Sequence, residues 1–321
     1  KEKELPISQE EKILIIPEGF PEPVFPLDNE FTNARWELGK KLFYDPVLSR
    51  DSTISCASCH FAEKAFSDDV PFSLGVEEAI GTRNSPTLAN VAYHPYYTRE
   101  GGIPTLEMQI LVPIQEHNEF DFNVVLIIEK LQKDSTYQQM SRLAYDRGEM
   151  DAFVLTRAIS TFERSLISGD SRYDKYFFQN NSNILTDAEL RGMDLFFGEK
   201  TGCSNCHNDF NFTNYAFENN GLYDNYSDPG RFRLTGDEND RAKFKVPTLR
   251  NIELTAPYMH DGSMETLEEI ILHYESGGKN YPNKSELLQP FTLTETERNE
   301  LILFLKTLTD ESFISNPLFK E

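Results

Sequence analysis

The chain has 321 residues and a formal net charge of −22, because 53 acidic residues outnumber 31 Lys and Arg. This length is typical of two domains, and the acidity disfavours nucleic acid and anionic membranes as partners. No apolar run reaches the length of about 20 residues that a transmembrane helix needs.

The first part of the chain contains one clear helix between irregular segments. Residues 1–28 are rich in Pro and Glu and are expected to form an extended arm. An apolar stripe that includes Trp36 and Phe43 predicts a helix over Asn33–Phe43. Residues 65–120 contain much Gly, Pro and Asn, and the sequence predicts a long loop region there.

Helical patterns dominate the rest. Helices are predicted over about 123–147 and 151–178. Capping boxes start three more, at Thr186–Glu189, Thr266–Glu269 and Thr294–Glu297, the last running through Leu308. Residues 208–245 are polar and loop-like.

The helix that starts at Thr186 shares a Glu-Leu, Gly and Leu-Phe pattern with Asn33–Phe43, which indicates a weak internal repeat. Strand signals are sparse. We therefore expect a mainly α fold of two domains with long loops, comprising residues 1–165 and 166–321.

All four cysteines fall in two copies of one motif, Cys56-Ala57-Ser58-Cys59-His60 and Cys203-Ser204-Asn205-Cys206-His207. The C-x-x-C-H pattern attaches c-type haem: each thiol can bind a vinyl group, and the His can bind the iron. A redox C-x-x-C pair needs no adjacent His, and a zinc site of four thiolates would leave both His residues without a role. The sequence therefore predicts two cytochrome c-like domains, each with one covalent haem c, and His60 and His207 as iron ligands.

Five further segments, at 38–45, 83–87, 106–113, 245–251 and 256–262, give the chain a resemblance to a known family. Over roughly residues 30–310 it is similar to the bacterial dihaem cytochrome c peroxidases, which include the MauG branch. The resemblance implies that the haem of the N-terminal domain is the peroxide site. The second haem would then store and relay electrons.

The resemblance also bears on the ligands of the first haem. Many family members bind its iron with a second His, and Val76 stands at that position here. Because an aliphatic side chain cannot bind iron, we expect an open first haem. His94 and His117 remain alternative ligands.

Two residues match the catalytic residues of the family. Glu119 would take a proton from peroxide and return it to the leaving oxygen, which requires that desolvation raise its pKa. Gln109 would orient the peroxide by hydrogen bonding.

The second haem of the family usually has a Met as its sixth ligand. Counted from His260, Tyr274 stands at that position, and the MauG branch has Tyr there. Phenolate ligation lowers the potential of a haem relative to Met ligation. Met264 and Met259 remain rival ligands.

The region between the haems departs from the family pattern. Arg99 stands where the family commonly has a Trp, and the only Trp of the chain is Trp36. Tyr96, Tyr97 or a route through a haem propionate could carry electrons instead.

The resemblance further implies one calcium ion between the domains. Its ligands would be the side chain of Asn84 and the backbone carbonyls of Thr255 and Pro257.

The function implied is an oxidoreductase that reduces hydrogen peroxide to water with electrons from a small donor cytochrome or another redox protein. Two alternatives remain, a MauG-like enzyme that oxidises residues of a partner protein and a non-enzymatic electron carrier or peroxide sensor. Family members are often homodimers. Because the sequence starts at Lys1 without a signal segment, we expect a processed, exported, periplasmic protein, and a lipid anchor is compatible with this.

Overall fold

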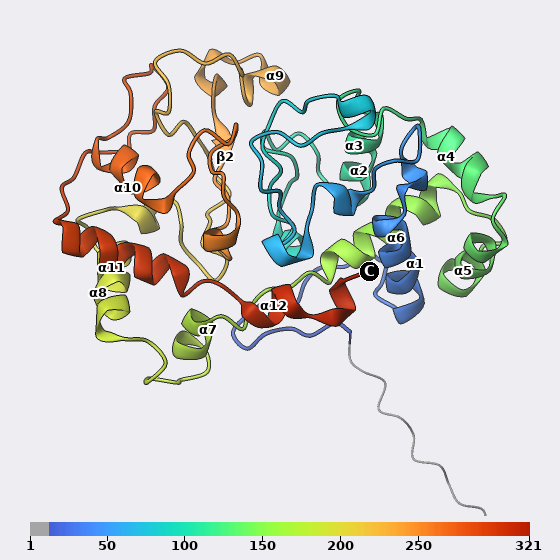
Figure 1. Cartoon of the computed structure of the whole chain (residues 1–321), viewed down its shortest axis with the longest axis horizontal. Helices are drawn as coiled ribbons and strands as arrows, with labels where there is room; N and C mark the ends of the chain where they lie inside the picture. The colour runs from blue at the N-terminus through green and yellow to red at the C-terminus, as the bar shows by residue number, and fades with distance from the viewer. Residues whose placement is uncertain (1–12) are drawn as a thin grey trace, which may run out of the picture.

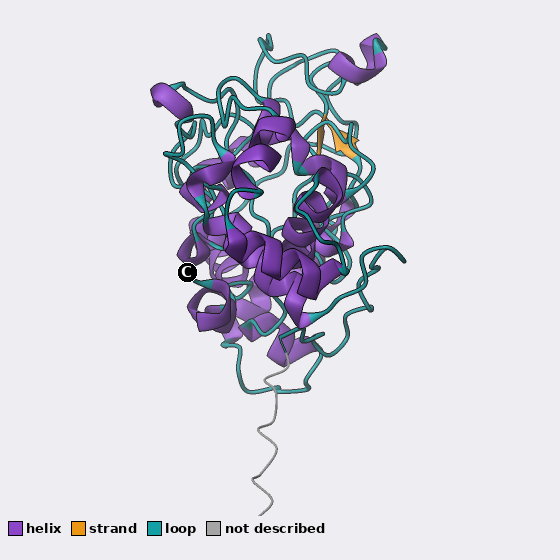
Figure 2. Ribbon diagram, turned by 90° about the vertical axis from the view of Figure 1, so that its right-hand side faces the viewer, coloured by secondary structure: helices purple, strands orange, loops and turns teal. Residues whose placement is uncertain are grey.

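The computed structural model describes residues 13–321, and these are mainly helical with long connecting loops (Figures 1 and 2). The expected arm falls partly outside this range, because residues 1–12 are not described. Residues 13–28 run without helix or strand, as expected. No helix in the described range is both long and apolar enough to cross a membrane.

The first half is built on the crossing of α1 (Asn33–Tyr44) and α6 (Ala152–Arg164). A Cβ atom on Gly39 would lie only 1.9 Å from the carbonyl oxygen of Ala158. Glycine therefore lets the two backbones approach this closely. The buried rings of Phe43 and Phe162 lie 5.0 Å apart beside this crossing and join the first hydrophobic core.

The second half repeats this crossing with α8 (Asp187–Phe197) and α11 (Glu295–Lys306). A Cβ atom on Gly192 would lie 2.0 Å from the carbonyl oxygen of Glu300. Phe196 and Phe304, with ring centroids 5.1 Å apart, take the places of the two phenylalanines of the first core. The internal repeat predicted from the sequence is therefore present in the fold.

The repeat extends into the loops. Asn90 and Asn251 both have left-handed backbones, with φ of 61° and 59°. Their N–H groups donate to the carbonyls of Leu166 at 2.8 Å and Leu308 at 3.0 Å. These matched contacts fix which residue of one half corresponds to which residue of the other.

Two predicted helices are each broken in the structure. The segment 123–147 forms α4 (Val124–Leu131) and α5 (Ser135–Tyr145), because the Asp134 side chain caps the start of α5. The segment 151–178 forms α6 and then α7 (Arg172–Phe177), which starts at the capping box of Ser171.

The predicted loop region 65–120 also differs in part, since it contains α2 (Leu106–Gln109) and α3 (Leu111–Gln115). The Thr105 side chain caps α2. The polar segment 208–245 is irregular except for α9 (Phe232–Thr235) and two-residue strands β1 (Phe217–Glu218) and β2 (Phe244–Lys245), which pair antiparallel.

The end of the chain returns to the first half. After α10 (Leu267–Glu275) and α11, the helix α12 (Glu311–Ser315) follows. Phe313 and Phe319 pack in the first core. In Figure 1, α12 accordingly lies beneath the junction of the two halves. The domain boundary at 165/166 stays a prediction, with the final segment crossing back over it.

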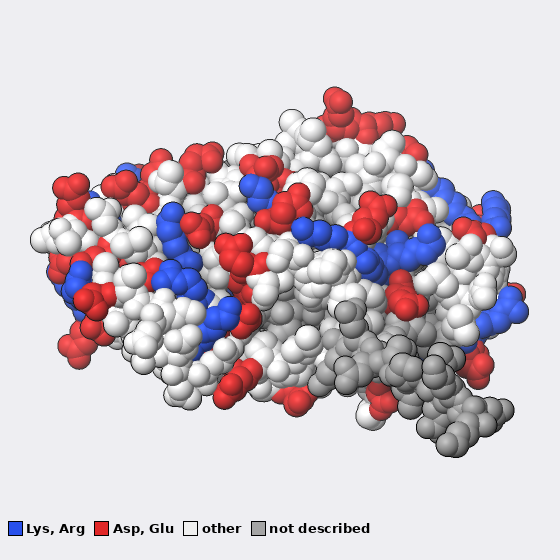
Figure 3. Space-filling view, turned by 60° about the horizontal axis from the view of Figure 1, so that its bottom comes forward, with Lys and Arg blue, Asp and Glu red and all other residues white. Residues whose placement is uncertain are grey.

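Charged groups join the two halves. Arg83 donates to both oxygens of Asp228, at 2.6 and 2.9 Å, and pairs with Glu100 at 2.6 Å. On the outer face drawn in Figure 3, acidic side chains are spread widely, and Lys and Arg gather in a few groups between them.

Candidate haem centres

The first cysteine motif forms a tight turn that orients its histidine. Residues Cys56–Ser58 form a short 3-10 helix, and the N–H of His60 donates to the carbonyl of Cys56 at 3.1 Å. The His60 Nδ1 lies 2.8 Å from the carbonyl oxygen of Phe66, to which it can only donate. This contact fixes the tautomer and leaves Nε2 free to bind a metal. Burial lowers the pKa of His60, which favours the neutral ring that a metal needs.

The second motif has the same geometry. Residues Cys203–Asn205 form a short 3-10 helix, and the N–H of His207 donates to the carbonyl of Cys203 at 3.0 Å. The His207 Nδ1 lies 3.0 Å from the carbonyl oxygen of Phe212. Burial lowers the pKa of His207 to about 4, so this ring is neutral as well.

A cavity of about 430 Å³ opens beside the first motif, bordered by Cys56, Cys59 and His60. The thiols of all four cysteines are free. Two thiols at the edge of an apolar cavity, with one neutral imidazole, are the donor set of a c-type haem. The residues present therefore fit the cofactor that the sequence predicts.

Gln109, at the end of α2, and Glu119, in the loop after α3, border this same cavity. Glu119 is accessible from the cavity, but its surroundings still desolvate the carboxyl. This desolvation, with a smaller contribution from the charge of Glu116, raises the pKa of Glu119 to about 7. The structure thus brings both predicted catalytic residues to the haem motif.

The three residues discussed in connection with a sixth ligand of the first haem iron lie away from this cavity. Val76 is 2% exposed and is not among the residues that border the cavity. His117 is exposed and pairs with Asp121 at 2.5 Å. His94 is buried between the halves, with Nδ1 3.3 Å from the ammonium of Lys245. Neither histidine borders the cavity.

Sequence reasoning missed two residues of the cavity wall, Glu163 on α6 and Pro113 on α3. The sequence did contain a signal for Glu163, because this acidic residue follows Ile159 by four residues and so lies on the apolar stripe of a predicted helix. Pro113 corresponds to Tyr274 in the repeat. The correspondence between Pro113 and Tyr274 becomes visible only from the matched loop contacts of the two halves.

Tyr274 lies on α10 and is half-buried. Burial raises its pKa to about 12, and the charges of Cys203 and Cys206 contribute to this rise. Tyr274 therefore lies within electrostatic range of the second motif.

The two rival methionines are engaged differently. The Sδ of Met259 accepts a hydrogen bond from Asn220 at 3.2 Å. Met264 pairs with Tyr258 through its backbone and packs against the second core.

Arg99, at the position of the family Trp, binds Asn84 rather than filling an aromatic slot. Its Nη2 donates to the backbone carbonyl of Asn84 at 2.6 Å and to the Oδ1 atom at 3.2 Å. Aromatic rings nearby span the junction: His94 lies 6.4 Å from Tyr97 and 5.3 Å from Tyr215, centroid to centroid.

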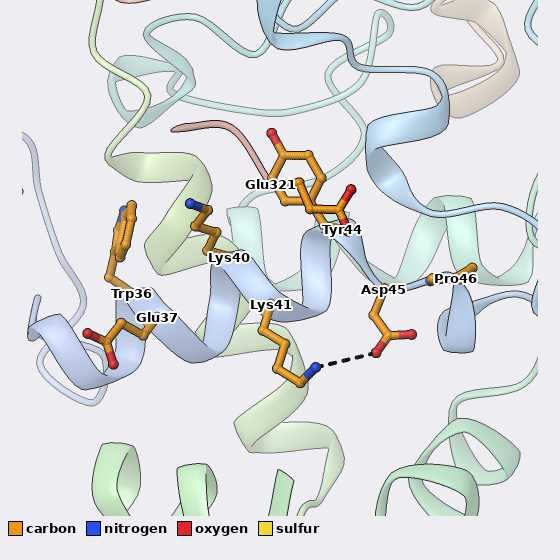
Figure 4. A pocket seen from close by; sticks show the side chains of 8 residues that line it. All are labelled: Trp36, Glu37, Lys40, Lys41, Tyr44, Asp45, Pro46 and Glu321. Atoms are coloured by element: carbon orange, nitrogen blue, oxygen red, sulfur yellow. Dashed lines mark ion pairs between the residues drawn. The ribbon is translucent and has the colours of Figure 1, made fainter. Parts of the chain in front are cut away.

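Trp36 lies away from this junction, in the first core, and its Nε1 donates to Ser165 at 2.7 Å. It also borders a second hollow, of about 520 Å³, on the outer face of α1 (Figure 4). There the ammonium of Lys41 pairs with Asp45 at 3.9 Å. No haem motif residue lines this hollow.

Two crossed-helix halves, each with a haem motif, define a dihaem c-type protein. The family described as di-haem cytochrome c peroxidase matches residues 33–183. The methylamine utilization protein MauG of Methylorubrum extorquens is 35% identical over 297 residues, which are 92% of this chain and 83% of MauG. The cytochrome c551 peroxidase of Nitrosomonas europaea is 33% identical over 279 residues, which are 86% and 80% of the two chains.

A solved structure agrees with these relatives. A MauG-like protein associated with microbial copper homeostasis superposes with a TM-score of 0.90 and 37% identity, covering 95% of this chain and 97% of that one. The chain belongs to the dihaem cytochrome c peroxidase family, and it is an oxidoreductase of that family.

Proposed function

We propose that this protein is a dihaem peroxidase that reduces hydrogen peroxide to water with electrons from a small redox protein, and that its first haem site is open to peroxide. One observation carries the proposal: Gln109 and Glu119 border the cavity of the first haem motif, and among residues 13–321 no histidine other than His60 borders it. An electron carrier has no need of a carboxyl and an amide beside its haem, so this arrangement argues against a pure electron carrier.

The side chains divide the work. Cys56 and Cys59 would hold the first haem and His60 its iron; when bound, this haem supplies the metal that binds peroxide. Glu119 takes the proton of the near oxygen and returns it to the leaving oxygen, which requires a pKa near the working pH. Gln109 holds the peroxide in place by hydrogen bonding.

Cys203, Cys206, His207 and Tyr274 would hold the second haem, the last two through its iron. A buried tyrosine gives up its proton when a cation takes its oxygen. Because phenolate ligation favours the oxidised metal, this haem would have a low potential.

Tyr274 also favours a second candidate function, a MauG-like enzyme that uses peroxide to oxidise residues of a partner protein. The MauG relative and the MauG-like structure support this candidate to the same degree as the peroxidase relatives support the first.

One assay separates the two candidates. The holoprotein is given peroxide with a reduced small cytochrome in one arm and with a partner protein, analysed by mass spectrometry, in the other. Repeated turnover with the cytochrome supports the peroxidase. Failure to oxidise the cytochrome, together with oxidised residues on the partner, would support the MauG-like reaction instead.

The proposal includes one calcium ion between the halves, and the repeat supports it. Asn84 corresponds to Lys245, whose ammonium donates to the carbonyl of Tyr96 at 2.9 Å. The related carbonyl is that of Pro257. It receives no hydrogen bond from the described part of the chain, and neither does the carbonyl of Thr255. A cation bound there by Asn84, Thr255 and Pro257 would take the place that the Lys245 ammonium has at the related position of the repeat.

Arg99 already donates to the Asn84 oxygens, so it would compete with the ion. Metal analysis after dialysis tests the site. Replacement Asn84→Lys should supply an internal ammonium and abolish calcium binding, whereas Arg99→Gln should strengthen it. Unchanged calcium content in Asn84→Lys would refute the site.

We further infer an exported, periplasmic location, because haem attachment to C-x-x-C-H takes place outside the bacterial cytoplasm. The net charge of −22 suits a basic electron donor. A homodimer is proposed by analogy with the family alone, and sedimentation analysis of the holoprotein tests it.

A further inference from the structure

Glu163 is a buried carboxyl that borders the first cavity and has no hydrogen-bond partner for its Oε2 atom in the described part of the chain. The residue is 4% exposed. It lies one helical turn beyond Ile159, and both residues form part of the cavity wall together with Cys56.

The cation nearest to Glu163 in sequence is already used. Arg164 donates to both oxygens of Glu107, with Nη2 at 3.0 Å, and to Ser160 at 3.1 Å. Glu107 adds a second negative charge close to Glu163. Arg164 holds the pKa of Glu107 at about 2 although Glu107 is buried. Glu163 therefore has no cation of its own to stabilise a carboxylate.

The other titratable groups around Glu163 are uncharged near neutral pH or lie across the cavity. Burial raises the pKa of Tyr97 to about 12 and that of the Cys56 thiol well above its usual range. His60 and Glu119 also border the cavity. So do three arginines, but each has another partner: Arg83 and Arg233 pair with Glu100, and Arg99 donates to Asn84. Burial raises the pKa of Glu163 itself to about 8; Arg164 partly opposes this shift and Glu107 adds to it. Glu163 thus carries a proton at pH 7.

The second half of the protein has no such group. The matched crossings place Phe162 opposite Phe304, so Glu163 corresponds to Leu305. Leu305 is 8% exposed and packs in the second core. An unpaired buried carboxyl costs stability relative to a leucine. Only the half that also presents Gln109 and Glu119 bears that cost.

We propose that Glu163 is a second proton-holding residue of the first haem cavity, which stores a proton on its carboxyl and releases it into the cavity when peroxide is reduced. This role rests on the peroxidase function proposed above. Reduction of one hydrogen peroxide to two waters consumes two electrons and two protons. The electrons come from the redox partner. One proton leaves the Glu163 carboxyl, and the other comes from solvent by way of the Glu119 carboxylate, which ends the cycle as it began. A further proton from solvent restores the Glu163 carboxyl.

Infrared spectroscopy of the holoprotein detects the stored proton without turnover. At pH 7 the wild type should show the carbonyl stretch of a protonated carboxylic acid that disappears only as the pH rises through about 8, above the range near pH 7 in which the Glu119 carboxyl loses its proton. Glu163→Gln and Glu163→Leu should both lack it, and Glu163→Asp should show a shifted band. If the band persists in Glu163→Gln, Glu163 holds no proton and the proposal is wrong.

The potential of the first haem gives a second readout that a purely structural role would not change. A carboxylate near the iron stabilises the ferric state, so the wild-type potential should fall as Glu163 loses its proton above about pH 8. Glu163→Gln should remove this fall. Glu163→Leu copies the residue of the second half, so it serves as the variant expected to fold.

Turnover links the proton to the reaction. Glu163→Gln and Glu163→Leu should slow peroxide reduction by roughly 10²-fold, and Glu163→Asp should restore most of the rate. Wild-type rates in both neutral variants would overturn the role in peroxide reduction. If the wild type does not turn over peroxide although the band and the potential both depend on Glu163, the peroxidase function fails and the protonation site stands.

Discussion

The backbone N–H of Val76 donates a hydrogen bond of 2.9 Å to the carbonyl of Glu119. The residue at the family's ligand position thus holds the loop that presents the candidate catalytic carboxyl. Close packing supports this arrangement, because a Cβ atom on the adjacent Gly75 would lie 2.2 Å from the carbonyl oxygen of Asn118. The same loop that lacks a histidine therefore positions an acid.

The first prediction concerns the open site. The fully oxidised protein should show a high-spin ferric signal in electron paramagnetic resonance and should bind cyanide without prior reduction. His117→Ala should leave both properties unchanged, because this side chain is exposed and faces Asp121. Two low-spin signals in the oxidised protein would mean that another residue, with His94 the first to replace, closes the site.

The second prediction concerns the protonation of Glu119. Its pKa is raised to about 7, so the carboxylate that accepts the peroxide proton forms as the pH rises through 7. The rate of reaction with peroxide should rise over the same range, and Glu119→Gln should slow it by roughly 10²–10⁴-fold.

A matched control for this prediction is Glu116→Gln. Removal of the Glu116 charge should lower the pKa of Glu119, so the rise in rate should move to lower pH with little loss of maximal rate. Stopped-flow kinetics across pH measures both variants. A near-wild-type rate in Glu119→Gln would remove Glu119 from the mechanism.

The third prediction concerns Tyr274 as an axial ligand. Tyr274→Phe should change the oxidised absorption spectrum, and Tyr274→Met should raise the potential of the second haem, as Met ligation does in cytochromes c. Tyr258→Phe is the control. It removes a buried hydroxyl of the same core, which donates to the carbonyl of Ile252 at 2.9 Å. An unchanged spectrum and unchanged potentials in Tyr274→Phe would make Met264 the better candidate.

The fourth prediction tests the two haems directly. The intact mass of the protein should exceed that of the polypeptide by two haems, because both motifs have free thiols and a free imidazole nitrogen. The double replacement Cys203→Ala with Cys206→Ala should lose one haem and keep the other. A wild-type mass with a single haem would contradict the assignment.

The fifth prediction concerns the repeated helix crossing. Gly39→Ala and Gly192→Ala should each lower the free energy of unfolding by about 1–3 kcal/mol, because the added methyl group would meet a backbone carbonyl. Gly148→Ala is the control, since nothing lies within 4 Å of a Cβ atom at that position. Its effect should stay within about 1 kcal/mol. Thermal unfolding of the holoproteins measures all three, and equal effects would contradict the close crossing.

The sequence alone determined the features that depend on local chemistry. The two C-x-x-C-H motifs, the capping boxes at Thr186, Thr266 and Thr294, and the mainly helical class all follow from residue types at short spacing, and the structure contains each of them. The presence of Gln109 and Glu119 at one site was also predicted, but from the resemblance rather than from spacing.

Tertiary structure decided what depends on contacts between distant segments. The partner of Gly39 lies on α6, more than a hundred residues away, and periodicity carries no information about that approach. The breaks at Asp134 and after Arg164 follow from caps and buried extended segments that compete with helical propensity.

Glu163 illustrates the difference most clearly. In the sequence it is one more acid in an acidic chain, next to an arginine that could neutralise it. Only the fold commits that arginine to Glu107, buries the carboxyl and turns it toward the haem cavity. The protonation state of a side chain depends on its desolvation and on the charges around it, and neither is fixed until the chain has packed.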